Sequence, residues 1–130
     1  MKKKILIVLA NYYNDISTKL LNSALDELDN FKIVNIIKVP GIFEIPVTIS
    51  KYIKKVDGVV ALGCVIKGKT PHFEFISNAA TFGIMNISVN YKKPIGNGII
   101  TCLNKKQAYK RIKKGSEASK AVISILSQKK

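Results

Sequence analysis

One histidine marks the first candidate site for chemistry in this chain. His72 lies in residues 63–75, GCVIKGKTPHFEF, beside two lysines and just before a segment with helical spacing. An imidazole titrates near neutral pH and can both give and take a proton, which suits general acid–base catalysis. Thr70 as N-cap and Pro71 at the first helical position would leave backbone amides for an anion. The segment predicts proton transfer beside an anion-binding loop, with a purely structural histidine as the alternative.

Part of the same segment fits the phosphate-loop pattern G-x-x-x-x-G-K-[ST], from Gly63 to Thr70. Three features argue against a nucleotide triphosphatase. No other predicted strand ends in an aspartate that could hold magnesium. Val65 and Ile66 are bulky where the loop must bend, and Pro71 falls inside the helical turn that would follow. We interpret the match as a chance occurrence of a short pattern.

Strand-like and helical segments alternate along the whole chain. Apolar runs, typical of parallel strands buried on both faces, predict strands at 5–10, 32–39, 58–63 and 95–102. Helical spacing predicts helices at 16–28, 45–56, 76–87, 107–112 and 117–127, with Asp15 as the first N-cap and a hinge near Gly115. This alternation predicts an α/β fold, a three-layer αβα flavodoxin-like domain with a four-stranded parallel sheet. We expect residues 1–130 to form a single domain.

The composition gives weaker signals. The net charge is +14, and the sequence has 21 lysines but only one arginine, Arg111. The lysines are scattered along the sequence rather than clustered, which disfavours a nucleic-acid partner; a basic nucleic-acid-binding domain stays the alternative reading. No apolar run is long enough to cross a membrane. Cys64 and Cys102 have no metal-ligand spacing between them, so we expect reduced thiols, a cytoplasmic protein and no metal site.

The segments that follow the predicted strands carry the other candidate residues. Tyr12 follows the first strand, residues 39–46 (VPGIFEIP) close the second, and residues 63–72 follow the third. The carboxyl ends of parallel strands meet at one edge of a sheet, where ligands bind. Each feature alone could be structural: Tyr12 could be a packing residue, and Glu44 could cap a helix. Together they predict a pocket with an aromatic platform, polar groups, an anion site and an imidazole.

Two of these segments resemble signatures of the lumazine synthase family. Residues 39–46 resemble its V-P-G-A-F-E-I-P motif, and residues 61–72, ALGCVIKGKTPH, resemble its A-L-G-x-V-I-R-G-x-T-x-H motif. Shorter matches lie at residues 11–13, at QAYKR (107–111) and at KGSEA (114–118), in the family's order. The resemblance therefore covers nearly the whole chain.

What the resemblance implies is a transferase of riboflavin biosynthesis that needs no cofactor. It would condense 5-amino-6-(D-ribitylamino)uracil with 3,4-dihydroxy-2-butanone 4-phosphate to 6,7-dimethyl-8-ribityllumazine, with release of phosphate and water. By position, His72 would transfer protons and Tyr12 would stack on the pyrimidine. The other implied substrate-binding residues are Ile42, Phe43 and Glu44 for the ribityl chain, Cys64, Val65 and Ile66 for a backbone-lined edge, Lys69 and Thr70 for phosphate, and Asn97 and Arg111 from an adjacent subunit.

The resemblance also implies a homo-oligomer, a pentamer or a multiple of pentamers, because the family's site is shared between subunits. The chain departs from the family pattern at three places. Asn97 stands where phenylalanine is common, and Tyr13 stands where asparagine is common. About five residues fewer separate Arg111 from Lys114 than in typical members.

Overall fold

A computed structural model describes residues 1–68 and 72–129. Its four strands follow the apolar runs of the sequence: β1 (Lys4–Ala10), β2 (Lys32–Val39), β3 (Gly58–Ile66) and β4 (Ile95–Cys102). All neighbouring strands are parallel, and their order across the sheet is β2-β1-β3-β4. The predicted four-stranded parallel sheet is therefore confirmed, with β2 and β4 at its two edges.

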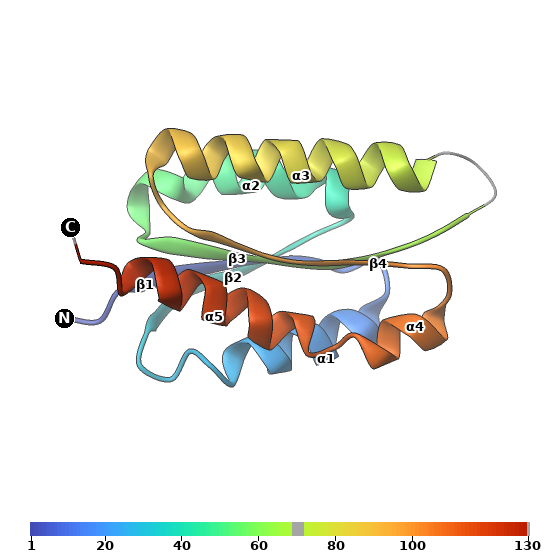
Figure 1. The fold of residues 1–130 in the computed structure, drawn as a ribbon, viewed down its shortest axis with the longest axis horizontal. Coiled ribbons are helices and arrows are strands. Elements are labelled where there is room, and N and C mark those ends of the chain that lie inside the picture. Colours follow the sequence, from blue (N-terminus) through green and yellow to red (C-terminus); the bar gives the residue numbers. More distant parts are fainter. Residues whose placement is uncertain (69–71, 130) are drawn as a thin grey trace.

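Helices cover both faces of this sheet, as Figure 1 shows. The helices are α1 (Asn14–Leu25), α2 (Ile45–Tyr52), α3 (His72–Tyr91), α4 (Lys105–Lys110) and α5 (Lys114–Leu126), with short 3-10 turns η1 (Ile42–Glu44) and η2 (Ile53–Lys55) on either side of α2. The α2 and α3 helices form one layer, and α1, α4 and α5 form the other (Figure 1). This is the predicted three-layer αβα arrangement of a flavodoxin-like domain.

The alternation of side chains along β1 separates the two layers of the core. Leu6, Val8 and Ala10 pack in the cluster under α2 and α3. Ile5, Ile7 and Leu9 point to the opposite face and pack with residues of α1 and α5. Successive strand residues point to opposite sides of a sheet, and a strand with helices on both faces must be apolar throughout. That is why the two central strands, β1 and β3, show no polar alternation.

Two predicted helix details are wrong for tertiary reasons. Asp15 is not the N-cap of α1; it lies in the first turn, and its carboxylate accepts a hydrogen bond from the Tyr109 hydroxyl of α4. The break between the last two helices, predicted near Gly115, falls at residues 111–113; Gly115 itself is buried in the first turn of α5, where this helix meets the backbone of Leu20 in α1. The predicted N-cap at Thr70 lies outside the described residues. Among those that are described, no helix is long and apolar enough to cross a membrane.

Candidate active site

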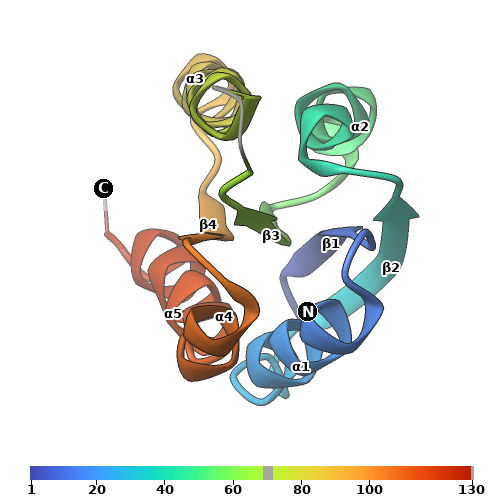
Figure 2. The ribbon, with the colours of Figure 1, turned by 90° about the vertical axis from the view of Figure 1, so that its right-hand side faces the viewer.

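The carboxyl ends of the strands form one edge of the sheet, seen end-on in Figure 2. Backbone hydrogen bonds extend the pairing just past the strands here. The Asn11 N–H donates to the Val39 carbonyl at 2.9 Å, and the Lys67 N–H donates to the Cys102 carbonyl at 2.8 Å. The segments after β1 and β2 therefore leave the sheet side by side, as do those after β3 and β4. Candidate residues from distant parts of the sequence gather at this edge.

Tyr12 supplies an exposed aromatic surface at this edge. Its side chain is 74% exposed, and its ring meets the ring of Tyr13 edge-on, with centroids 4.9 Å apart. Tyr13 is half-buried, and this burial, together with Tyr12 and Cys64, raises the pKa of the Tyr13 hydroxyl. Tyr12 is thus held by its neighbour while one side of its ring stays open to a flat ligand.

In the turn η1, the side chains of Phe43 and Glu44 are available to a ligand, and the side chain of Ile42 packs into the core. Ile42 is buried and packs against Gly63 of β3, where an added Cβ would overlap the Ile42 side chain and lie 3.0 Å from Ala10. Phe43, the next residue, is 62% exposed. The absence of a side chain at Gly63 thus lets Ile42 pack into the core and hold the turn in place. Phe43 and Glu44 are then positioned at the carboxyl edge of the sheet.

Glu44 does not act as a helix cap. It occupies the N-cap position of α2, but its side chain accepts no capping hydrogen bond. The carboxylate turns back toward Gly41, where an added Cβ would lie 3.2 Å from Oε1. With Phe43, Pro46 and Val47 it lines a hollow of about 470 Å³ that Ala79 and Ala80 of α3 close on the other side. The structural alternative for Glu44 therefore does not account for where its carboxylate lies.

The last residues of β3 alternate between the two faces of the sheet. Val65 and Ile66 are half-buried at the strand end, with Val65 on the side of α2 and α3. Cys64 points the other way, into a cluster with Ile16 and Cys102. Burial, and then the neighbouring Cys102 thiol, raises the pKa of Cys64 to about 12. Only backbone atoms of Cys64 can therefore face a ligand on the side of α2 and α3.

The candidate general acid–base residue lies at the start of α3. His72 is the first residue of this helix, and its side chain is exposed. Of the predicted anion loop before it, Lys69 and Thr70 lie outside the described residues. His72 is thus placed at the helix start that the sequence predicted.

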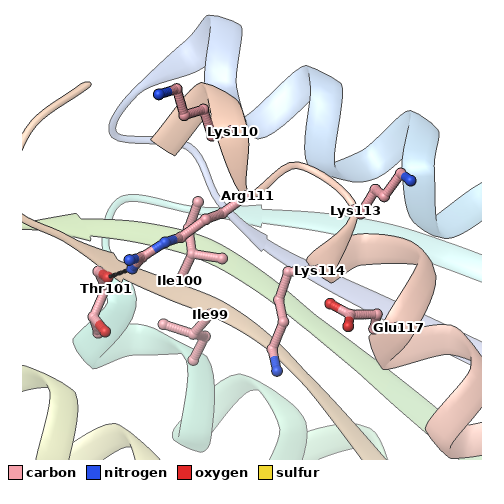
Figure 3. Close-up of a pocket in the computed structure, with 8 residues that line it drawn as sticks. All are labelled: Ile99, Ile100, Thr101, Lys110, Arg111, Lys113, Lys114 and Glu117. Atoms are coloured by element: carbon pink, nitrogen blue, oxygen red, sulfur yellow. Dashed lines mark hydrogen bonds between the residues drawn. The ribbon is translucent and has the colours of Figure 1, made fainter. Parts of the chain in front are cut away.

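Arg111 and Asn97 lie along β4, the edge strand, rather than beside Tyr12 and Glu44. The Arg111 Nη1 donates to the Thr101 carbonyl at 2.6 Å, which holds the guanidinium at the carboxyl end of β4 (Figure 3). Asn97 is exposed on the same strand, and its Oδ1 accepts a hydrogen bond from the Ile99 N–H at 3.1 Å. The described part of the chain therefore does not bring these two residues together with the first group.

A second hollow of about 430 Å³ surrounds Arg111 (Figure 3). Its lining residues are Ile99, Ile100, Thr101, Lys110, Arg111, Lys113, Lys114 and Glu117. Arg111 and Lys114 extend toward β4, whereas Lys110 points away from it (Figure 3). Four cationic side chains and one carboxylate give this hollow a net positive charge, which favours the binding of an anion. Lys114 was missed by the sequence reasoning, although the KGSEA motif that contains it was a usable signal.

The fold and these groups define a class of protein. A parallel α/β domain with an aromatic platform, a carboxylate, an imidazole and a cationic hollow near the carboxyl ends of its strands is built for a small anionic substrate. The sequence profile of the 6,7-dimethyl-8-ribityllumazine synthase family matches residues 2–130. The chain belongs to this family.

Individual relatives agree over most of their lengths. A 6,7-dimethyl-8-ribityllumazine synthase of Buchnera aphidicola subsp. Baizongia pistaciae is 43% identical, over 99% of this chain and 92% of its own length. Those of Bartonella bacilliformis and Afipia carboxidovorans are each 40% identical, over 97% and 95% of this chain and 90% and 83% of their own. The resemblance seen in the motifs is thus confirmed at the level of the family.

Proposed function

We propose that this chain is an enzyme that forms 6,7-dimethyl-8-ribityllumazine from 5-amino-6-(D-ribitylamino)uracil and 3,4-dihydroxy-2-butanone 4-phosphate, with release of phosphate and water. The observation that carries the proposal is the match to the family over residues 2–130, in a fold whose carboxyl edge presents the motif residues. The reaction is a group transfer and condensation that needs no redox step, so side chains alone can supply its acid, base and charge stabilisation.

The first group of residues fits the aminouracil. Tyr12 offers a ring face for stacking on the pyrimidine, which is worth most when the ring is held in place as it is here by Tyr13. Glu44, next to the hollow between α2 and α3, can accept hydrogen bonds from ribityl hydroxyls. Ile42 and Phe43 shape this part of the site, and the backbone at Cys64, Val65 and Ile66 provides peptide groups for the ring edge.

The proton transfers are assigned to His72. Amine attack on the ketone gives a carbinolamine, and loss of water from it gives an imine. Each of these steps moves a proton on or off nitrogen or oxygen, and an imidazole has one ring nitrogen that can donate a proton and one that can accept it. The exposed position of His72 at a helix start leaves it accessible to the substrate.

Phosphate departure requires fixed positive charge, which we assign to Arg111 and Lys69, and a hydrogen-bond donor, which we assign to the Thr70 hydroxyl. Negative charge grows on the leaving phosphate, and preorganised donors stabilise it without further reorganisation. Arg111 is already oriented by its bond to Thr101, and Lys114 adds a second cation in the same hollow. Asn97, which precedes Thr101 in β4, would contribute to substrate binding from the same edge strand.

Because Arg111 and Asn97 lie apart from Tyr12 and Glu44 in one chain, we infer that a site forms between subunits. The subunits would belong to a homo-oligomer, a pentamer or a multiple of pentamers. A row of exposed apolar side chains on α3 supports association: Phe75, Phe82, Met85 and Val89 are each at least 59% exposed. They recur at helical spacing, so they lie on one stripe of the helix surface. Such a stripe is typical of an interface rather than a solvated face. We propose a cytoplasmic location on the basis of the two reduced cysteines.

Turnover of the two substrates, followed by the absorbance of the lumazine product, tests the reaction directly. Absence of product with both substrates at saturating concentration would exclude it. The shared site has its own test in mixed oligomers of His72→Ala and Arg111→Ala, each inactive alone. After dissociation and reassembly in equal amounts, about a quarter of the sites should hold both native residues and regain turnover. If mixing restores nothing while each variant assembles normally, His72 and Arg111 serve the same subunit.

A further inference from the structure

Helix α4 meets the start of α1 through two side chains that the proposed reaction does not use. Lys105 and Tyr109 lie four residues apart in α4, so they share one face of this helix. The Lys105 Nζ lies 5.8 Å from the centroid of the Tyr13 ring, and the Tyr109 hydroxyl donates a hydrogen bond to the Asp15 carboxylate. Both contacts fall within three residues of Tyr12, the proposed aromatic platform.

The structure around α4 makes this short helix a fixed support. The Asn104 side chain accepts a hydrogen bond from the Gln107 N–H at 2.9 Å, and the Gln107 side chain accepts one from the Leu103 N–H at 2.7 Å. Ala108 is fully buried in the apolar cluster that also contains Ile16 of α1. The start of α4 and its inner face are therefore held in place, and the side chains on its other face are held with them.

Tyr13 connects this support to Tyr12. Tyr13 is half-buried and packs against the same apolar cluster as α4, and its carbonyl accepts a hydrogen bond from the Ser17 N–H at 2.8 Å. Its ring lies edge-on to the Tyr12 ring, with 4.9 Å between the centroids. Tyr12 itself is largely exposed. A shift of the Tyr13 ring would therefore shift the ring that is proposed to stack on the pyrimidine.

Both contacts from α4 involve a charged group. The Lys105 ammonium lies over an aromatic face, where a cation is attracted by the negative charge density of the ring. The Tyr109 hydroxyl donates to a carboxylate, and hydrogen bonds to ionised acceptors are stronger than those between neutral groups. The two contacts thus restrain two residues of the segment that leads from β1 into α1.

We propose, on the basis of the proposed function, that Lys105 and Tyr109 are positioning residues for the aminouracil, which hold the Tyr12 ring where it stacks on the pyrimidine. Lys105 acts through the Tyr13 ring, and Tyr109 acts through the Asp15 carboxylate. No covalent bond forms or breaks at either side chain. Loss of either contact weakens binding of the flat substrate, whereas phosphate binding is retained because the Arg111 guanidinium is held separately on the Thr101 carbonyl.

Steady-state kinetics of Lys105→Met test the first contact, because methionine keeps an apolar stem and removes the charge. We expect the KM for the aminouracil to rise about 2- to 5-fold, which corresponds to the loss of an exposed cation–π contact. The kcat and the KM for the butanone phosphate should not change. Lys105→Arg retains the cation and should restore the wild-type KM. Lys106→Met is the matched control, because it removes the same charge from the next, exposed position of α4.

Tyr109→Phe tests the second contact, because it removes only the hydroxyl group. The KM for the aminouracil should rise about 2- to 10-fold, the usual effect of one lost hydrogen bond. Asp15→Asn keeps an oxygen that can accept this bond and should stay closer to the wild-type KM than Tyr109→Phe does. Tyr91→Phe, at an exposed tyrosine of α3, is the matched control and should leave both KM values unchanged.

Near-ultraviolet circular dichroism gives a readout that does not require turnover. The chain has five tyrosines and no tryptophan, so tyrosine rings dominate this spectrum. Lys105→Met should reduce the tyrosine signal and Lys106→Met should not. In a Tyr13→Leu background, Lys105→Met should change neither the spectrum nor the KM for the aminouracil, because the ring through which Lys105 acts is gone.

Three results would each overturn the proposal. The first is an unchanged spectrum and an unchanged KM for the aminouracil in Lys105→Met and Tyr109→Phe. The second is an equal change in Lys106→Met, which would make the effect one of net charge. The third is a full effect of Lys105→Met in the absence of the Tyr13 ring, which would place Lys105 on the substrate itself. If the wild type forms no product, the proposed reaction fails, and the spectra still decide whether α4 holds the tyrosine pair.

Discussion

Gly63→Ala is the substitution for which the structure gives the clearest quantitative expectation. The added methyl group would overlap the Ile42 side chain and lie 3.0 Å from the Ala10 Cβ. Ile42 is 6% and Ala10 2% exposed, so neither can move into open space. Restoring ordinary contact requires the Ile42 methyl group to move by about 1 Å, within a core packed as densely as an organic crystal.

The cost of such overpacking is about 1–3 kcal/mol, a sizeable part of the roughly 5–15 kcal/mol that stabilises a domain. At about 3–6 °C per kcal/mol for a chain of this size, the melting temperature should fall by roughly 3–18 °C. The displacement should also reach the site, because Ile42 anchors the turn that presents Phe43 and Glu44. We therefore expect a raised KM for the aminouracil, with a smaller effect on the KM for the butanone phosphate.

Urea denaturation and steady-state kinetics of the same preparation measure both effects. Gly68→Ala is the matched control, because a Cβ at Gly68 would meet no atom within 4 Å. Its stability should stay within about 0.5 kcal/mol of the wild type, as for most surface substitutions. If Gly63→Ala unfolds at the same urea concentration as Gly68→Ala, Ile42 has room to move and does not anchor the turn. If it is destabilised with an unchanged KM, the turn does not position the substrate.

Three further predictions concern single side chains. His72→Ala should fold normally and lose turnover by about 10²- to 10⁴-fold, the usual effect of removing a positioned acid–base group; wild-type turnover would remove His72 from the mechanism. Arg111→Lys should weaken phosphate binding by calorimetry with little change for the aminouracil, since a guanidinium grips two phosphate oxygens and an ammonium does not; Lys106→Ala, at an exposed lysine of α4 outside the residues that line the hollow, is the control. Burial raises the pKa of Cys64 from 9.0 to about 12, so the neutral thiol is favoured. The free energy of unfolding that depends on this neutral thiol is fully present below about pH 9 and is lost as pH rises toward 12. Iodoacetamide at pH 8 should therefore label Cys64 only after denaturation, and rapid labelling of the native chain would contradict this.

Short-range patterns in the sequence predicted most of the fold. Apolar runs predicted the strands, most clearly the central β1 and β3, because a parallel strand between two helical layers has no polar side. Gly83 lies within the predicted helix 76–87, and a Cβ there would lie 2.9 Å from Pro46 of α2, so this glycine lets the two helices pack closely. Pro46 lies in the first turn of α2, where a missing backbone N–H is tolerated. In each case the constraint acts within a few residues or on one helix face, where sequence spacing is informative.

The errors arise where one element constrains another across the fold. An aspartate before an apolar helix is a good N-cap by local rules, but Asp15 is oriented by the Tyr109 hydroxyl, 94 residues away. This hydrogen bond lowers the pKa of Asp15. A glycine between two short helical segments suggests a hinge, yet Gly115 lies within α5 because only a residue without a side chain can approach the Leu20 carbonyl so closely. Neither partner can be inferred from the local sequence.

The single arginine illustrates why residue type and position must be read together. Its bond to the Thr101 carbonyl uses one of the five guanidinium N–H donors and leaves four in a fixed plane. An ammonium in the same place would have three donors on a rotating group, and the carbonyl would not orient the remaining two. A chain that uses lysine at 21 of its 22 basic positions therefore has a physical reason to keep arginine at this one. The same bond ties the guanidinium to β4, an edge strand of the sheet, which is where a neighbouring subunit of the proposed oligomer would meet it.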